Sequence, residues 1–209
     1  MESDLLIKVL DRSKNVEYYG GDQGWFDTKT AKEYGCGVIA LANVIITHER
    51  LTDRKNPGIL KVEKSRYMQV AEVLKKKYLP IIPKLGISGI ELAIGANAYF
   101  LKNGLNVIAR WGVKPNNLWD SVDRMLKKNW PVILAIGPNN TLIGKKCLDL
   151  QGDVSNSTAR AHYVTITAAD EATITVSSWG SKYVILKEDY EAYMKKISNP
   201  LFSNILYIK

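Results

Sequence analysis

Cys36 lies between two glycines, at the start of a long apolar run in the stretch EYGCGVIALANVIIT. Apolar residues in this run would occupy every face of a helix, which predicts a buried helix from about Gly35 to about His48. Backbone N–H groups at a helix N-terminus lack partners, and the helix dipole is positive there, so both stabilise a thiolate. Cys36 is therefore a candidate nucleophile. The alternative is a cysteine that only fills space, as most buried free cysteines do.

The chain has two histidines, and His162 begins the segment HYVTITAADEATITVSSWG. Alternation in this segment predicts two strands around a turn at Ala169–Ala172. If the turn is centred between Ala169 and Asp170, His162 lies opposite Ser177 on the neighbouring strand. A residue in that place can hydrogen-bond the far nitrogen of the imidazole and fix its tautomer. The predicted series of nucleophile, base and orienting residue is Cys36, His162 and Ser177. His48, by contrast, is interpreted as a cationic residue at a helix C-terminus.

Three segments together resemble the papain-like cysteine peptidases. YGCGVIALANVI is similar to their cysteine-bearing helix, and AHYVTI followed by VSSWGSKYVI is similar to their histidine strand and the Asn-Ser-Trp-Gly strand after it. WPVILAIG occupies the place of the Pro-Val-Ile strand before the histidine in bacteriocin-leader peptidases and similar small bacterial domains. The order and spacing of these motifs cover much of the chain from Gln23 to Ile185.

The resemblance implies an α+β, papain-like fold in one domain over residues 1–209, with a helical lobe over about 1–104 and an antiparallel sheet lobe over about 105–209. Cys36 matches the nucleophile of the family and His162 its general base. Gln23 matches the glutamine of the oxyanion hole, with the backbone N–H of Cys36 as the second donor. For Gln23 the alternative is an ordinary turn residue in GGDQGW.

Ser177 matches the third catalytic position, where the family has Asn or Asp. A serine hydroxyl is shorter and neutral, so it supports an imidazolium less than an aspartate would, and Asp153 or Asp170 could stand in for it. Trp179 matches the tryptophan that shields the orienting hydrogen bond from water. The expected binding positions are Gly35, Gly37, Ser178 and Trp179, the glycines because they let a substrate backbone approach closely.

The function implied is a cysteine hydrolase that cleaves a peptide or amide bond through an acyl-enzyme on Cys36. Two alternatives use the same scaffold: an acyl transferase, or a catalytically weak or inactive binding module, which Ser177 favours. The net charge of +8 raises a third possibility, a nucleic-acid or anionic-membrane binder. However, the lysines in KVEKSRY, LKKKYL and LKKNW fall on predicted helix faces or helix ends, where cations are ordinary.

The composition is that of a globular protein, with 46% hydrophobic and 24% charged residues. Cys36 and Cys147 are too few for a disulfide framework, which favours reduced thiols and a cytoplasmic setting. The N-terminal residues do not resemble a secretory signal, and no apolar run is long enough for a membrane span. No metal-ligand spacing is present, and no cofactor is expected. The expected partner is a peptide or protein substrate.

Further elements must position these residues. Helices are predicted within 61–79, 89–103, 115–129 and 187–197, with Ser88 as an N-cap and Gly104 just past a helix end. Strands are predicted at 106–111, 130–137 and 203–209. Helices thus dominate the first half and an antiparallel sheet the second. The long polar loop 138–160 is a candidate lid.

Overall fold

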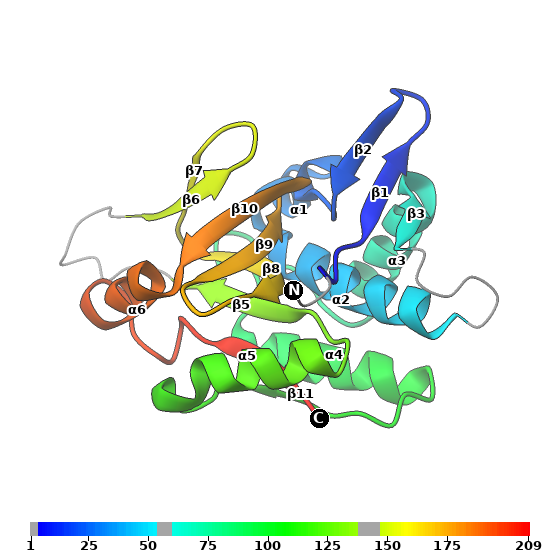
Figure 1. The fold of residues 1–209 in the computed structure, drawn as a ribbon. Coiled ribbons are helices and arrows are strands. Elements are labelled where there is room, and N and C mark those ends of the chain that lie inside the picture. Colours follow the sequence, from blue (N-terminus) through cyan, green and yellow to red (C-terminus); the bar gives the residue numbers. More distant parts are fainter. Residues whose placement is uncertain (1–3, 54–59, 138–146) are drawn as a thin grey trace.

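A computed structural model describes residues 4–53, 60–137 and 147–209. The chain combines helices with largely antiparallel sheets, so the predicted α+β class is confirmed (Figure 1). The helices are α1 (Lys29–Tyr34), α2 (Cys36–Thr52), α3 (Lys64–Lys77), α4 (Gly89–Lys102), α5 (Leu118–Lys127) and α6 (Lys187–Lys196), with short 3-10 helices η1 (Gln23–Trp25) and η2 (Pro115–Asn117). The division into lobes near residue 104 stays a prediction.

The strands form two sheets. The larger has the order β4-β11-β5-β8-β9-β10-β6-β7, and all its pairs are antiparallel. Its strands are β4 (Ala109–Trp111), β5 (Val132–Ile136), β6 (Leu148–Gly152), β7 (Ser157–Ala159), β8 (His162–Ala169), β9 (Thr173–Ser178), β10 (Ser181–Leu186) and β11 (Ile205–Ile208).

The smaller sheet, which the sequence patterns did not predict, lies in the first half of the chain. Its order is β2-β1-β3, from β1 (Lys8–Asp11), β2 (Val16–Tyr19) and β3 (Lys61–Glu63), with β1 and β3 parallel. The strands are only three or four residues long, too short for alternation to mark them.

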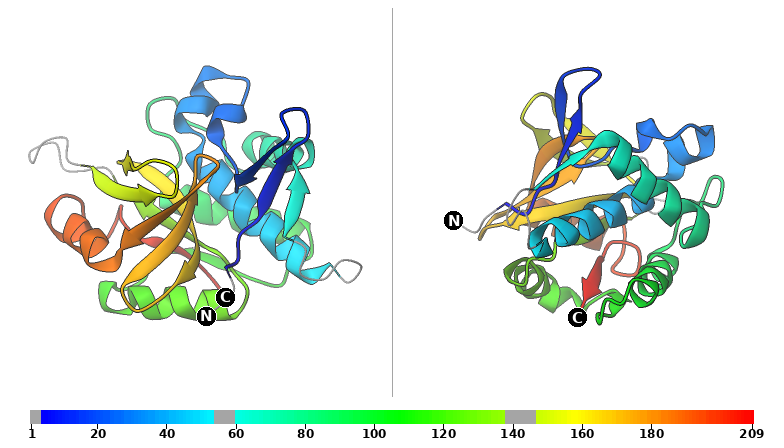
Figure 2. Two further views of the ribbon diagram at one scale, coloured as in Figure 1. Left: turned by 45° about the horizontal axis from the view of Figure 1, so that its top comes forward. Right: turned by 90° about the vertical axis from the view of Figure 1, so that its right-hand side faces the viewer.

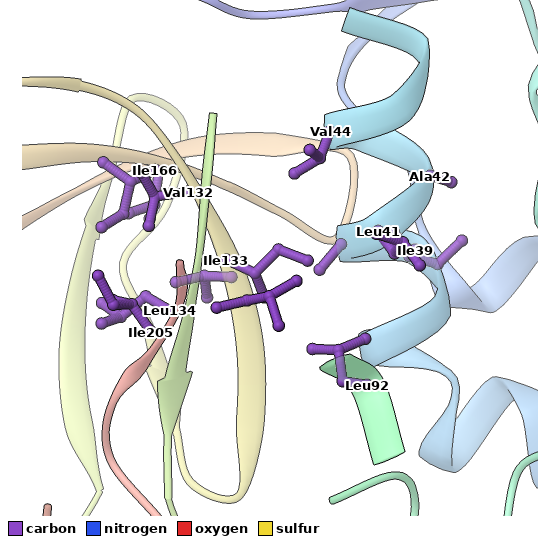
Figure 3. Close-up of a cluster of buried hydrophobic side chains, with 14 of the residues drawn as sticks. Ile39, Leu41, Ala42, Val44, Leu92, Val132, Ile133, Leu134, Ile166 and Ile205 are labelled. Carbon is purple, nitrogen blue, oxygen red and sulfur yellow. The ribbon is translucent and has the colours of Figure 1, made fainter. Parts of the chain in front are cut away.

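The helix that carries Cys36 is central to the fold. All eleven residues from Gly37 to Thr47 are buried, as the apolar run predicted. The helix α2 packs against β8 and β5, and Figure 3 shows its Leu41 and Val44 on the side that faces strand residues such as Ile133. This packing fixes the N-terminal end of α2 relative to the strand that begins at His162. Figure 2 shows α3 and the small sheet on the other side of α2.

The ends of α4 follow the predicted signals. The Ser88 hydroxyl accepts from the backbone N–H of Glu91, whose carboxylate accepts from the Ser88 N–H, so a capping box is formed. Gly104, with φ of +69°, follows the C-cap Asn103 and supplies the left-handed conformation that ends many helices. Most other predicted helices and strands are also found, with shifted ends.

Two predictions made from the sequence need correction. Part of the polar loop 138–160 is a hairpin, β6–β7, and residues 138–146 lie outside the described part of the chain, so the lid is not tested. His48 is not a solvated cation: its ring stacks on Trp130 at 3.9 Å between centroids, and burial lowers its pKa. No helix among the described residues is long and apolar enough to cross a membrane.

Candidate active site

Cys36 is the first residue of α2, and its side chain lines a small pocket together with His162 and Gln23. The pocket lies between the N-terminal end of α2 and the start of β8. Backbone N–H groups of Tyr163, Gly37 and Cys36 itself are close enough to the sulfur to lower the pKa of the thiol. The thiol therefore lies beside the residue that directly follows His162, which brings together the three side chains that were predicted from separate motifs.

His162 is held on one side by an aromatic ring and on another by a hydroxyl. Its imidazole stacks on the indole of Trp179, with 4.2 Å between ring centroids and 14° between planes. Its Nε2 lies 2.7 Å from the Oγ of Ser178. Because Nε2 is engaged by Ser178, Nδ1 is the ring nitrogen left to face a reacting group. This division of the two nitrogens is what a general base with an orienting partner requires.

The electrostatics of the pocket favour a neutral thiol and a neutral imidazole. Burial lowers the pKa of His162 to about 3. Burial also raises the pKa of the Cys36 thiol, although the three backbone N–H donors partly oppose that effect. At neutral pH the resting pair is therefore thiol and imidazole, not thiolate and imidazolium. A proton would move from sulfur to nitrogen only as the sulfur attacks.

Trp179 reaches its place over His162 through an unusual backbone conformation. It has φ of +48° and is followed by Gly180 with φ of +69°, in a two-residue turn that pairs Ser178 with Ser181. Positive φ at both turn residues is typical of a type I′ turn, in which Asn-Gly is preferred and a bulky residue is disfavoured. Strain of this kind gathers at functional sites, which points to a role for the indole where it lies.

The predicted pairing of His162 with Ser177 is wrong. Ser177 lies opposite Thr165, three residues further along β8, and Ser178 makes the hydrogen bond to the imidazole. Side chains alternate between the two faces of a strand. A register shift of three residues therefore places Ser178, and not Ser177, on the face of the sheet that carries His162. The Ser177 hydroxyl instead donates to the backbone carbonyl of Tyr19, at 2.8 Å.

The register differs because the hairpin turn differs from the predicted one. The carboxylate of Asp170 accepts from the backbone N–H groups of Ala172 and Thr173, which moves the turn toward β9. An aspartate that binds the backbone two and three residues on is a known turn signal, and Asp170 could have been used to place it. A bulge between Ile166 and Ala168 adds one residue to β8, which takes back part of this shift and leaves the register three residues from the predicted one.

Neither carboxylate expected as a substitute reaches His162. Asp170 is at the turn of the hairpin, whereas His162 is at the opposite end of β8. Asp153 follows β6 and lines a different pocket with Tyr18 and Lys182. A serine hydroxyl is therefore the group that orients the imidazole among the described residues. Unlike an Asn side-chain oxygen, which only accepts, this hydroxyl can donate or accept, so it does not fix the tautomer by itself.

Gln23 is near the pocket but is engaged elsewhere. Its Nε2 donates to the backbone carbonyls of Lys32, at 2.7 Å, and Glu33, at 3.3 Å. The residue thus lines the pocket while its amide nitrogen joins η1 to the end of α1. To donate to an oxyanion, this nitrogen would have to exchange at least one of these contacts for the substrate.

The protein's own packing leaves no room for a side chain at Gly35 and little room at Gly37. A Cβ at Gly35 would lie 2.3 Å from the backbone oxygen of Ala31 and 2.8 Å from the Phe26 ring. A Cβ at Gly37 would lie 3.3 Å from the Tyr163 ring. The close neighbours of both glycines therefore explain why glycine is found there, and the predicted approach of a substrate backbone stays a prediction.

Asn43 is a component of the site that the sequence patterns did not reveal. It is buried on α2, and its Nδ2 donates to Thr165, at 3.1 Å, and to Ser177, at 3.4 Å. Its Oδ1 accepts from the Gly21 N–H, at 3.0 Å, and from the Tyr67 hydroxyl, at 2.8 Å. Asn43 thereby joins α2 to the hairpin and to the loop that leads into Gln23. A single polar residue inside an apolar helical run was the available signal.

No group of three or more His, Cys, Asp or Glu residues in the described ranges is placed to hold a metal ion. Cys147, the second cysteine, is exposed and does not line the pocket of Cys36.

No family model matches the chain, and no curated protein matches it. Among solved structures the chain is similar to a Bacillus anthracis protein that has been provisionally described as a C39-like peptidase. The two chains are 14% identical, the match covers 90% of this chain and 93% of the other, and the TM-score is 0.48. A likeness at this level transfers neither structure nor activity, and the function of this chain is inferred from its own residues.

Proposed function

We propose that this chain is a papain-like cysteine hydrolase that cleaves a peptide or amide bond through an acyl-enzyme on Cys36. One observation carries the proposal: Cys36 at the start of α2 and His162 at the start of β8 line the same pocket, and Ser178 binds the far nitrogen of the imidazole. A cysteine and a histidine that only filled space would not need an oriented ring or a stacked indole.

In the proposed reaction the Cys36 sulfur attacks the carbonyl carbon while its proton passes to His162. The oxyanion would be bound by backbone N–H groups at the start of α2, with Gln23 as the second donor after it turns away from α1. His162 then gives the proton to the leaving amine, and water releases the acid from the thioester. Since the resting pair is neutral, His162 acts as a general base during the attack.

The test is labelling by an epoxide probe directed at papain-class thiols. We expect the wild-type protein to be labelled once, Cys36→Ala to remain unlabelled, and Cys147→Ala to be labelled like the wild type. The Cys147 variant is the matched control, because it removes the other cysteine of the chain. Equal labelling of wild type and Cys36→Ala would refute the proposed nucleophile.

A catalytically inactive binding module is the second candidate, and the neutral Ser178 and the raised pKa of the Cys36 thiol favour it. The two candidates differ in how His162 affects the thiol. For a hydrolase, His162→Ala should slow alkylation of Cys36 at pH 7 by roughly a hundredfold, the lower end of what general-base assistance contributes. For a binding module, alkylation should be as slow in the wild type as in His162→Ala.

An acyl transferase would show the same alkylation as a hydrolase but would pass the acyl group to an added amine.

A further inference from the structure

A second cavity, of about 550 Å³, is lined by His162 and Tyr163 but not by Gln23. Its walls are the segment 82–91 around the start of α4, the ends of β5 and β8, and residues 201–202. His162 and Tyr163 also line the pocket of Cys36, so this groove adjoins the candidate active site. Its volume lies in the range of small-molecule and cofactor sites.

Four exposed apolar side chains line this groove. Leu85 is 81% exposed, Leu201 is 64% exposed, and Ile82 and Phe202 are 41% and 48% exposed. All four line the groove, and the indole of Trp111 lines it as well. Large apolar side chains that gather at one concave place on a surface mark a binding site for an apolar group.

The hydrogen-bond donors of Tyr163 and Trp111 in the groove are engaged by the protein itself. The Tyr163 hydroxyl donates to the backbone carbonyl of Ile87, at 3.0 Å. The Trp111 indole N–H donates to the backbone carbonyl of Leu201, also at 3.0 Å. Both contacts join different segments of the groove wall, so an occupant that displaced them would weaken the groove itself.

The end of β5 is also satisfied internally. The carbonyl of Ala135 accepts from the Tyr190 hydroxyl, at 3.0 Å, and that of Gly137 accepts from the Tyr193 hydroxyl, at 2.8 Å. The Gly137 N–H donates to Ser203, at 3.0 Å. A peptide in extended conformation binds best where the protein offers backbone donors and acceptors, whereas a hydrocarbon chain needs only apolar area.

The charged residues of the groove lie at its edge. Glu91 is exposed, and its carboxylate is engaged by the N–H of Ser88 in the capping box. Lys84 is exposed and belongs to the short turn that also carries Leu85. The lining of the groove is therefore mostly apolar, and the polar contacts of Tyr163, Trp111 and the end of β5 belong to the protein itself.

We propose that this groove binds the acyl chain of a fatty N-acyl amide, so that the bond cleaved at Cys36 joins a long acyl group to an amine. The inference rests on the proposed hydrolase function and adds its substrate class. A C–S bond forms between Cys36 and the acyl carbon, the C–N bond breaks, and the thiol proton leaves on the amine by way of His162. Water then hydrolyses the thioester, which releases the fatty acid and restores the thiol.

The activity test uses acyl 4-nitroanilides with chains from acetyl to tetradecanoyl, and an acetylated leucine-rich peptide 4-nitroanilide for comparison. We expect kcat/KM to rise by about fourfold for each added methylene until the groove is filled. Leu85→Asp should abolish most of that gain. Leu101→Asp is the matched control, because Leu101 is 84% exposed at the far end of α4 and does not line the groove.

A binding test separates this inference from the hydrolase proposal. Dodecanoic acid should bind Cys36→Ala in calorimetry, and Leu85→Asp but not Leu101→Asp should weaken that binding at least tenfold. Binding without turnover of any anilide would refute the hydrolase and retain the groove. No binding, a flat dependence on chain length, or faster cleavage of the peptide anilide than of every acyl anilide would overturn the acyl groove.

Discussion

At the scale of single residues, Ser178 is the group on which the proposed chemistry depends most. Its hydroxyl binds Nε2 of His162 at 2.7 Å but can act as donor or acceptor. When it donates to Nε2, Nδ1 carries the proton and cannot accept one from the thiol. Only a fraction of the molecules would then hold a competent base at any moment. An Asn or Asp in this place would remove that ambiguity.

We expect Ser178→Ala to lower kcat/KM by roughly fivefold to tenfold, the equivalent of losing one neutral hydrogen bond of about 1 kcal/mol. Ser178→Asn should restore or exceed the wild-type value, because an amide oxygen accepts from Nε2 and leaves Nδ1 free. Steady-state hydrolysis of an amide substrate measures both effects. If Ser177→Ala lowered activity more than Ser178→Ala at equal stability, the assignment of the orienting residue would be wrong.

Asn43 has a different role, because its hydrogen bonds join α2 to the hairpin and to the loop before η1, and involve neither the thiol nor the imidazole. We expect Asn43→Ala to lower the free energy of unfolding by about 1–3 kcal/mol, since it leaves buried polar partners such as Thr165 and Tyr67 unsatisfied. It should also raise KM or lower kcat through the loop that leads to Gln23. Chemical denaturation measures the first effect, and Asn43→Asp should retain more stability than Asn43→Ala.

Individual residues of the site were predictable from type and place, but their contacts were not. Cys36 and His162 stood out because each combines a reactive side chain with the start of a predicted element. Asn43 was missed because its four partners come from segments that lie far apart in the sequence. The choice between Ser177 and Ser178 depended on a register that periodicity alone does not determine.

At the scale of elements, the turn between β9 and β10 places Trp179 over His162. The positive φ of Trp179 is disfavoured for a bulky residue, so the indole is kept there against local preference. Its stacked ring excludes water from the imidazole and contributes to the low pKa of His162.

Replacement of Trp179 by Asn should separate the conformation of the turn from the shielding of the imidazole by the indole. Asn suits the first position of a type I′ turn, so the hairpin should be retained. Loss of the ring would expose the imidazole, and we expect the pKa of His162 to rise from about 3 toward its ordinary value of about 6.5. NMR titration in a His48→Gln background leaves a single histidine to observe. Trp179→Phe should keep the pKa low, and an unchanged pKa in Trp179→Asn would exclude shielding by the indole.

The elements themselves followed from the sequence more closely than their pairing did. The capping box at Ser88 and the glycine after α4 are local signals, and both were found where they were predicted. The hairpin β8–β9 was predicted as an element, but its turn was centred too early because alternation does not reflect the hydrogen bond from the Thr173 N–H to the Asp170 carboxylate. The small sheet was missed because its strands β1 and β3 are far apart in sequence and pair in parallel.

At the scale of the whole molecule, burial of the two histidines couples folding to pH. His162 has a folded pKa of about 3 against about 6.5 when unfolded, so the unfolded chain binds more protons between these values. The contribution of His162 to the free energy of unfolding is therefore fully present above pH 6.5 and is lost as the pH falls from 6.5 toward 3. His48, whose pKa is also lowered by burial, contributes with the same sign.

We expect the free energy of unfolding to fall between pH 6 and pH 4 with a slope approaching about 1.4 kcal/mol per pH unit from His162 alone. Urea denaturation at several pH values measures the slope. His162→Gln should reduce it by most of that amount, and His48→Gln should reduce it less because His48 is less deeply buried. Equal slopes in wild type and His162→Gln would show that the imidazole of His162 is accessible to protons in the folded state.

The order of the large sheet has a consequence for biosynthesis. The last strand, β11, lies between β4 and β5, which precede it by about a third of the chain or more. While residues 205–208 are still within the ribosome, β5 lacks one of its two neighbours and the sheet that supports β8 is incomplete. Contacts of such long range also form slowly. A nascent chain would therefore expose Cys36 well before it acquires an aligned His162, and reactivity would appear only after β11 has left the ribosome and joined the sheet.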